Sequence, residues 1–505
     1  MKNIQFNQSQ FCYNNYNRHQ LLIVTVMCLL MFGITSCKKF LDVPPKDRVP
    51  QPVLLSDEQG FKDAMIGVYL GLDKPQNGGV YGLYTTDLSM GMLSAMAYNY
   101  DNVTTANVGT GGAFYTNTAA YSYADAQIKA EIAGIWGGMY TNIANLNNLL
   151  TQVDDKRSVF TKDNYYRVKG EAIGLRGLMH FDLLRLFGKS PLTGPDVKSI
   201  PYVNKFDIHS TPYSTVAQAL DSCINDLREA KKLLALTDTT ALLQASNDLY
   251  SAYTQNHLNY WTTEALLARA FLYQGNIDSA NYYAMAVIGS NKFPLINANV
   301  AGAGNSIRDR LFSQEVVFSV YSTGVALYNG QLFDKSGTAV PLRLQPAGKT
   351  ALYATGSGSV NDYRYTSWFD NNQAGVNVPS KYFQDANLPY PLQNNVPVVR
   401  VSEMYYISAE YANAKGDLNT GVAMLNSVRQ HRGLAALNAG GISSSDSVST
   451  EIMKEYQKEF IQEGQTFFYY KRLNKDLAKV TATTAVIPAN VYVFPLPDRE
   501  LQYNH

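Results

Sequence analysis

The sequence predicts a mainly helical protein in which blocks of helix alternate with two long, loop-rich segments. Two observations support this fold class. Apolar residues recur every three or four positions over several stretches, which is the spacing of one helix face. Between these stretches lie segments rich in Gly, Asn and Pro that carry short β-type runs such as residues 316–320. We expect the helical scaffold at about residues 40–72, 125–290 and 400–475.

Three helices of the middle block can be placed by their apolar residues. The first covers residues 128–150, where apolar side chains follow steps of three and four positions. The second covers residues 163–187 and ends at Gly188, because a glycine followed closely by a proline is a helix stop signal. The third covers residues 216–234, with residues 211–212 supplying its start.

Two segments, residues 268–280 and 409–421, share one spacing of small residues. Each begins with alanine, has a glycine seven positions later (Gly275 and Gly416), and has another small residue five positions after that glycine. This spacing resembles the tetratricopeptide helix–turn–helix, in which small residues let paired helices approach and glycine makes the turn. We expect a few degenerate helix pairs and not a uniform solenoid.

The loop-rich segments are residues 73–124 and 292–399. The first contains eight aromatic residues amid Gly, Asn and Thr, with few charges. Loops of this length inside a compact domain are usually either functional or disordered. Their aromatic content argues against disorder, so we expect both segments to be functional.

The N-terminal region contains an apolar run, Leu21–Gly33, which is followed by Ile-Thr-Ser-Cys37. The run has the length of a signal-peptide core, and small residues directly before a cysteine resemble the lipobox of bacterial lipoproteins. A transmembrane anchor is disfavoured because 13 residues fall short of the roughly 20 that span a bilayer. A plain cleaved signal with Cys37 incidental is the other alternative. We expect residues 1–36 to be removed, Cys37 to be lipidated, with palmitate among its acyl chains, and residues 37–505 to form the mature domain.

Composition excludes several classes of protein. Residues 1–36 hold two of the 42 Lys and Arg and none of the 41 Asp and Glu, so the rest of the chain has a net charge of −1. A near-neutral surface has no electrostatic footprint for nucleic acid. Only Cys223 lies beyond Cys37, which leaves the mature chain without an internal disulfide. Because Cys223 lies on the core face of its predicted helix, we expect it to be a small buried hydrophobe.

The sequence contains no complete signature of an enzyme. Residues 348–350 would end a phosphate-binding loop, but Arg343 occupies the position of its first glycine. The histidines lack metal-ligand spacing, and no Gly-x-Ser-x-Gly elbow is present. Glu455, Glu459 and Glu463 share one face of a predicted helix, a spacing more typical of salt bridges than of acid–base catalysis. We expect no catalytic residue, no metal and no cofactor.

Several motifs occur in the order found in one family. They follow the lipobox and lie at residues 40–45, 170–176, 181–188, 400–410, 426–433, 459–468 and 494–504. Together they resemble the SusD/RagB family of outer-membrane nutrient-binding lipoproteins, over the whole mature chain. The last motif matches the C-terminal strand of that family. Two departures are that Gly177 follows Arg176 where alanine is usual, and that the chain stops at His505 without a further segment that many members carry.

The resemblance implies a SusD-like fold with about four tetratricopeptide-like helix pairs and a loop-rich ligand-binding half with short strands. It implies a lipoprotein of the cell outer membrane, tethered through Cys37 and facing outward. Such a protein covers a SusC-like TonB-dependent transporter as a hinged lid and captures oligosaccharides, or in some members peptides, for import. It implies no catalysis. The family motifs also contain charged residues that we expect in buried ion pairs or caps, namely Glu171, Arg176, Arg400, Glu403 and Glu410.

Binding a neutral glycan requires flat aromatic faces ringed by amides and hydroxyl groups. The sequence has 36 tyrosines, most of which we expect between helices. By the architecture of the family, both loop-rich segments border the ligand, and from them we select Trp368 first, then Tyr98, Tyr100, Asn102, Tyr81, Tyr363 and Tyr365. For each of these, packing within its own loop is an equally good interpretation. We expect Trp368→Ala to weaken binding without changing the melting temperature.

Two other functions stay open at this point. The first is a peptide-binding member of the same family. The second is a helical-repeat adaptor that scaffolds an envelope complex through protein contacts alone and binds no soluble ligand. The aromatic segments argue against the adaptor, because a scaffold has no need of them.

Overall fold

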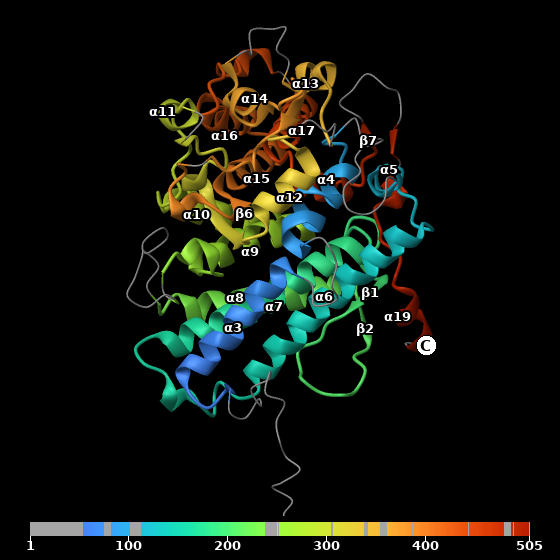
Figure 1. Cartoon of the computed structure of the whole chain (residues 1–505), viewed down its shortest axis with the longest axis vertical. Helices are drawn as coiled ribbons and strands as arrows, with labels where there is room; N and C mark the ends of the chain where they lie inside the picture. The colour runs from blue at the N-terminus through green and yellow to red at the C-terminus, as the bar shows by residue number, and fades with distance from the viewer. Residues whose placement is uncertain are drawn as a thin grey trace, which may run out of the picture. The chain divides into compact units, whose positions relative to one another are not determined.

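The computed structural model describes residues 54–74, 82–100, 113–237, 250, 252–304, 307–337, 342–353, 361–385, 387–442, 444–478, 486–487 and 489–503. These residues are mainly helical, which confirms the predicted fold class (Figure 1). The longer helices are α3 (Glu58–Asp73), α6 (Ala126–Leu150), α7 (Asn164–Phe187), α8 (Val216–Leu234), α9 (Tyr260–Gln274), α10 (Ile277–Gly289), α15 (Val401–Ala414), α16 (Leu418–Gln430) and α17 (Ser445–Glu459).

Shorter helices occur in both loop-rich segments and near the C-terminus. They are the π-helix η2 (Leu83–Met90), α4 (Met92–Met96), α5 (Phe114–Ala119), α11 (Ala298–Ala301), α12 (Val325–Phe333), α13 (Pro346–Tyr353), α14 (Tyr363–Ser367), α18 (Gln465–Arg472) and α19 (Asp498–Tyr503). Single 3-10 turns include η5 (Thr254–Asn256), η7 (Ser313–Glu315) and η10 (Tyr390–Leu392).

The long helices form a continuous array. From α6 through α7, α8, α9, α10, α15 and α16, each helix packs against the next, and α3 packs on α6 (Figure 1). Gly275 and Gly416 make the turns after α9 and α15 with φ angles of 87° and 81°, which favour glycine. The two segments with matched spacing are therefore helix–turn–helix pairs, as the sequence predicted.

The contact between α7 and α8 explains one departure from the family pattern. A Cβ atom at Gly177 would lie 3.1 Å from the Cβ of Asp226 and 3.3 Å from the carbonyl oxygen of Cys223, so alanine would crowd α8. The neighbouring Arg176 reaches across to Asp226 with two hydrogen bonds of 2.7 Å. Cys223 is fully buried on the same face of α8, which confirms its predicted role in packing.

Four short antiparallel sheets complete the described part of the chain. They pair β1 (Lys198–Pro201) with β2 (Tyr213–Thr215), β3 (Val316–Tyr321) with β6 (Asn395–Arg400), β4 (Phe369–Asn371) with β5 (Asn377–Pro379), and β7 (Leu477–Ala478) with β8 (Val486–Ile487). In the β3–β6 pair, Val316 lies opposite Arg400 and Tyr321 lies opposite Asn395. This pair therefore ties two segments that are about 80 residues apart.

Three local expectations are wrong. Helix α8 begins after Thr215, whose side chain forms a capping box with Gln218, because residues 213–215 are already used in β2. Residues 494–497 form no strand, and the chain continues into α19. Residues 82–100, placed in a loop-rich face, are instead buried and largely helical, because their apolar and tyrosine side chains pack into the core.

A buried ionic network joins the C-terminal helices to the second loop-rich segment. Its centre is Glu459, the last residue of α17, whose carboxylate accepts hydrogen bonds from Arg364, Arg400 and Arg432 at 2.5–3.0 Å. All four side chains have no exposed surface. Further carboxylates surround these arginines, namely Glu315, Asp362, Glu455 and Glu463. The predicted role of Glu455, Glu459 and Glu463 in salt bridges is confirmed.

The network stays charged although it is buried. Burial alone would raise the pKa of Glu459, but Arg432 and Arg400 hold that pKa well below its usual range. Glu455 follows the same balance, since burial is outweighed by Arg364, Lys458 and Arg429, and its pKa falls to about 2. An uncompensated charge left in such a site is strongly destabilising.

We predict that Glu459→Gln lowers the free energy of unfolding by about 3–5 kcal/mol, because it leaves three buried arginines short of one negative charge. Urea unfolding followed by circular dichroism measures this loss. The control is Glu451→Gln on the same helix, where a partly exposed carboxylate pairs with Lys454 at 2.7 Å and the expected loss is below about 1 kcal/mol. Equal losses in the two variants would contradict the proposed role of the network.

Candidate functional site

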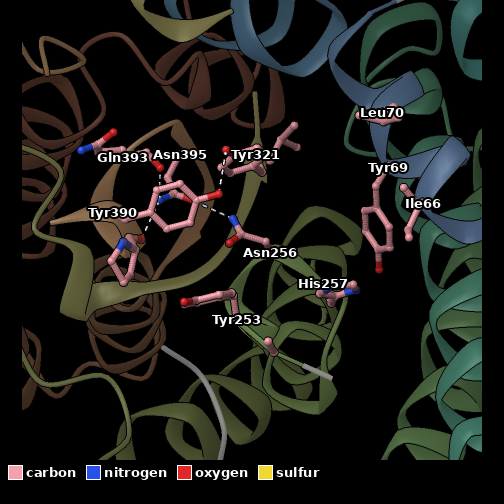
Figure 2. Close-up of a pocket in the computed structure, with 13 residues that line it drawn as sticks. Ile66, Tyr69, Leu70, Tyr253, Asn256, His257, Tyr321, Tyr390, Gln393 and Asn395 are labelled. Carbon is pink, nitrogen blue, oxygen red and sulfur yellow. Dashed lines mark hydrogen bonds between the residues drawn. The ribbon is translucent and has the colours of Figure 1, made fainter. Parts of the chain in front are cut away.

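An open pocket of about 240 Å³ lies between α3, residues 252–257, the end of β3 and residues 390–395. Figure 2 shows the side chains of α3 on one side and those of β3, β6 and η10 on the other, with residues 253–257 between them. The lining residues are Ile66, Tyr69, Leu70, Ala252, Tyr253, Asn256, His257, Val320, Tyr321, Tyr390, Pro391, Gln393 and Asn395.

Four tyrosines give this pocket its aromatic character. Tyr390 is 61% exposed, and its hydroxyl group lies 3.3 Å from that of Tyr321 (Figure 2). Tyr253 adopts a left-handed backbone conformation, with φ 50° and ψ 52°. This conformation is strained for a residue that carries a large side chain, and such strain clusters at functional sites. Exposed rings with polar tips suit a ligand that has both apolar and hydroxyl-bearing faces.

Amide side chains are held in place beside these rings. The amide nitrogen of Asn256 donates to Asn395 Oδ1 at 2.6 Å and to Ser319 Oγ at 2.9 Å. The amide nitrogen of Asn395 donates in turn to the carbonyl oxygens of Pro391 and Gln393, at 3.0 and 2.8 Å. Because the β3–β6 register places Tyr321 opposite Asn395, the ring and the amide reach the pocket together.

A buried carboxylate lies behind the pocket. Oε2 of Glu171, on α7, accepts hydrogen bonds from Tyr69 at 2.7 Å and from Tyr250 at 3.0 Å, and it lies 3.2 Å from His257 Nδ1. Burial, followed by the charge of Glu171, raises the pKa of Tyr69 well above its usual range. Glu171 therefore has the structural role that was predicted, and it also orients two residues that line the pocket.

A second hollow, of about 720 Å³, lies between α6 and residues 495–501. Its described lining consists mostly of Ala, Gly, Pro and charged residues, with Tyr123 and Trp136 as its aromatics and no amide side chain. The first pocket therefore combines several aromatic rings with amide side chains, and the second does not. Nowhere in the described ranges do three or more His, Cys, Asp or Glu side chains gather as metal ligands.

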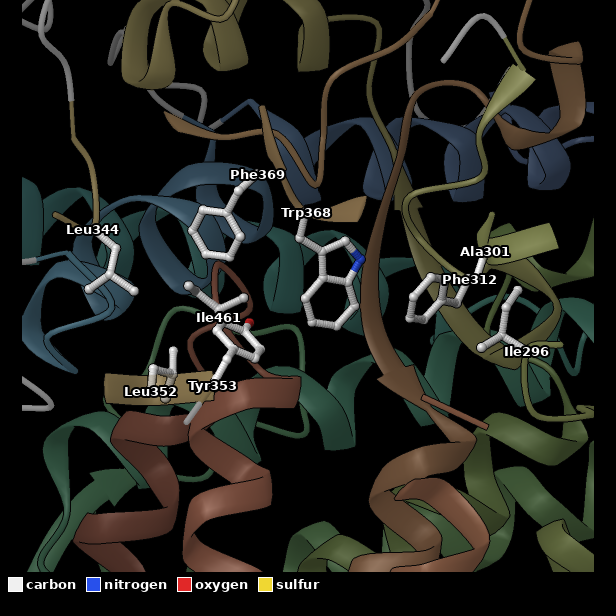
Figure 3. Close-up of a cluster of buried hydrophobic side chains, with 9 residues drawn as sticks. All are labelled: Ile296, Ala301, Phe312, Leu344, Leu352, Tyr353, Trp368, Phe369 and Ile461. Carbon is white, nitrogen blue, oxygen red and sulfur yellow. The ribbon is translucent and has the colours of Figure 1, made fainter. Parts of the chain in front are cut away.

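The leading sequence candidate, Trp368, is not at this site. It is fully buried, and its indole nitrogen donates to the carbonyl oxygen of Arg310 at 2.6 Å. Figure 3 shows the ring inside an apolar cluster, between Phe312 on one side and Phe369 and Ile461 on the other. The polar neighbours of Trp368 in the sequence do not belong to this apolar cluster. The indole ring is buried because removing its large apolar surface from water stabilises the fold.

The other candidates also differ from expectation. Tyr98 and Tyr100 are buried, and their hydroxyl groups donate to backbone carbonyl oxygens of Ala119 and Met90. Tyr363 and Tyr365 are half-buried against the Trp368 cluster, and Lys349 Nζ lies 3.9 Å from the centre of the Tyr365 ring. Tyr98 and Tyr100 therefore serve packing, and Tyr363 and Tyr365 are not among the residues that line the pocket. Cys37, Tyr81 and Asn102 lie outside the described residues.

Sequence reasoning missed the residues that do line the pocket. Tyr321 and residues 390–395 fall within the predicted loop-rich segment 292–399, where the run Tyr-Pro-Leu-Gln-Asn-Asn combines an aromatic ring with amides. That run is the sequence signal from which this part of the pocket could have been predicted. Tyr253 and Asn256 fall within the predicted helical scaffold, in a connection between α8 and α9 that apolar periodicity does not mark.

We predict that Trp368→Ala lowers the free energy of unfolding by about 3–5 kcal/mol, the usual result of deleting a buried aromatic side chain. Ligand affinity of the folded fraction stays unchanged, because the indole has no exposed surface. Urea unfolding and calorimetric titration of the same preparation measure both quantities, and Trp368→Phe gives a milder variant that keeps a ring. Weakened binding with unchanged stability would restore Trp368 as a ligand contact.

Two family models match the chain. One, described as "Starch-binding associating with outer membrane", matches residues 39–272, and the other, described as "SusD family", matches residues 328–493. SusD-like protein P38 of Formosa agariphila is 23% identical over 509 aligned residues, which cover 90% of this chain and 91% of that protein.

Solved structures give the same result for the fold. A SusD-like carbohydrate binding protein from Bacteroides vulgatus matches with a TM-score of 0.67 at 18% identity, over 89% of this chain and 97% of that one. A SusD superfamily protein from Bacteroides fragilis matches with a TM-score of 0.66 at 20% identity, over 89% and 99%. With both family models and the fold in agreement, this chain belongs to the SusD family.

Proposed function

We propose that this protein captures oligosaccharides at the outer membrane and delivers them to a SusC-like TonB-dependent transporter for uptake. The observation that carries the proposal is the pocket of four tyrosines ringed by amide side chains. Flat rings stack on the apolar faces of sugar rings, and amides and hydroxyl groups satisfy the sugar hydroxyls. The family description of starch binding, and the carbohydrate-binding relative from Bacteroides vulgatus, support the same class of ligand.

The proposed role is binding without catalysis. General acid–base chemistry requires a carboxylate or imidazole that can exchange protons with a bound substrate. Glu455 and Glu459, whose spacing would suit a pair of catalytic carboxylates, form ion pairs with arginines inside the protein. At the pocket, Glu171 is buried behind the lining and already accepts from two tyrosine hydroxyls. Its geometry suits orientation of neighbours and not reaction with a ligand.

Calorimetric titration against a panel of plant and host oligosaccharides tests the function. We predict that Tyr390→Ala weakens binding of the best ligand by about tenfold or more, which is 1.4 kcal/mol or more, because it removes the most exposed ring of the pocket. The matched control is Tyr282→Ala on α10, where a tyrosine of similar exposure, 67%, lies away from the pocket. The control keeps the affinity of the unchanged protein, and both variants keep its melting temperature.

The titration also separates the alternatives. Binding of peptides with no binding of any glycan would favour a peptide-capturing member of the family, for which the apolar lining by Ile66, Leu70 and Val320 is suitable. If the folded protein binds neither glycans nor peptides but still associates with a transporter, the result would favour the adaptor function. Equal weakening by Tyr390→Ala and Tyr282→Ala would contradict the pocket as the binding site.

Attachment to the membrane is proposed to depend on Cys37. Within the described ranges, no helix has the length and apolar character needed to cross a bilayer. A single acyl chain gives only marginal anchoring, whereas several chains hold a protein firmly. Outward orientation is proposed from the family and from the transporter partner.

We predict that Cys37→Ser abolishes incorporation of a labelled fatty acid and shifts the protein from the membrane fraction to the soluble fraction. Metabolic labelling with an alkyne analogue of palmitate, followed by fractionation, measures both results. Cys223→Ser is the control, because a fully buried cysteine is not acylated in the folded protein. Unchanged labelling of Cys37→Ser would show that this cysteine is not the anchor.

A further inference from the structure

The lining of the pocket is uncharged. Its described residues are tyrosines, amides, aliphatic side chains, a proline and His257, and they include no Asp, Glu, Lys or Arg. A site for acidic sugars or phosphates would be expected to present Arg or Lys to the ligand. The absence of Arg and Lys from the described lining therefore disfavours acidic sugars and phosphates as ligands.

The charge nearest to this lining is negative. Glu171 is 1% exposed and lies directly behind Tyr69 and His257. Lys62, whose ammonium group lies 5.8 Å from the centre of the Tyr250 ring, forms an ion pair with Glu58 at 2.8 Å. The other ionisable side chains of the described lining are tyrosines. Glu171 is therefore a buried charged group in direct contact with two residues of the lining.

The hydrogen bonds favour one tautomer of His257. The Tyr69 hydroxyl accepts from the backbone amide of Leu258 at 2.9 Å, so it gives its own proton to Glu171. An ionised carboxylate can only accept. The contact of 3.2 Å between His257 Nδ1 and the same oxygen therefore favours the tautomer with a proton on Nδ1 and a lone pair on Nε2. A ligand hydroxyl group can donate to that lone pair, whereas a carboxylate or sulfate cannot.

We propose that this pocket selects uncharged sugars over acidic ones, and that Glu171 contributes to this selectivity by orienting His257 so that Nε2 is the acceptor and by repelling anions. The inference rests on the proposed function. Glu171 and His257 act as positioning and specificity residues.

The test uses matched pairs of hexasaccharides, built from α-1,4-glucose, β-1,3-glucose, β-1,4-mannose and β-1,4-galactose. Each is titrated beside a counterpart whose primary alcohols are oxidised to carboxylates. At pH 8 we expect the best neutral ligand to bind at least about tenfold more tightly than its oxidised counterpart. At the same pH we expect His257→Gln, which keeps an uncharged hydrogen-bond acceptor, to leave this ratio within about twofold, and a clearly larger ratio would contradict the role of His257 as an uncharged acceptor.

Glu171→Gln removes the charge with little change of shape, and we expect it to reduce the ratio at pH 8. Its melting temperature is measured alongside, and if it does not fold, the comparison between His257→Gln and the unchanged protein decides. Equal or tighter binding of an oxidised hexasaccharide at pH 8 would overturn the selectivity while leaving sugar capture intact. Failure of all eight ligands would instead count against the proposed function itself.

Discussion

The three arginines around Glu459 are the constraint on which the rest of the structure depends. Arg364 belongs to α14, Arg400 ends β6, Arg432 follows α16, and Glu459 ends α17, so one carboxylate fixes four elements that are distant in the sequence. Buried ions add little net stability compared with apolar packing, but they tolerate only one arrangement. In this protein that arrangement determines where the second loop-rich segment lies on the helix array.

The same constraint reaches the pocket through β6. This strand begins at Asn395, in the pocket, and ends at Arg400, in the ionic network. Its pairing with β3 sets Tyr321 beside Asn395, and Asn256 then joins both strands through Asn395 and Ser319. On the opposite side, Glu171 of α7 positions Tyr69 and His257. The walls of the pocket are thus fixed by buried polar groups, which leaves the exposed Tyr390 ring available to a ligand.

Local sequence patterns were sufficient to predict the helical scaffold but not the residues that line the pocket. Apolar spacing placed α6, α7 and α8 to within two residues of most of their ends, and paired glycines identified two helix pairs. Trp368 was assigned wrongly because its polar neighbours suggest a surface loop, whereas Phe312 and Ile461, which bury it, come from remote parts of the chain. Tyr321 and Asn395 meet only through a strand pair that spans 74 residues, and no local pattern encodes such a pairing.

A crystal structure of the protein soaked with its best neutral oligosaccharide tests the central claim most directly. The account predicts a sugar ring stacked on Tyr390, within reach of the Tyr321 hydroxyl group and of Asn256 and His257, with the Trp368 cluster unchanged. A sugar bound in the hollow between α6 and residues 495–501, or an opened Trp368 cluster that contacts the ligand, would contradict it.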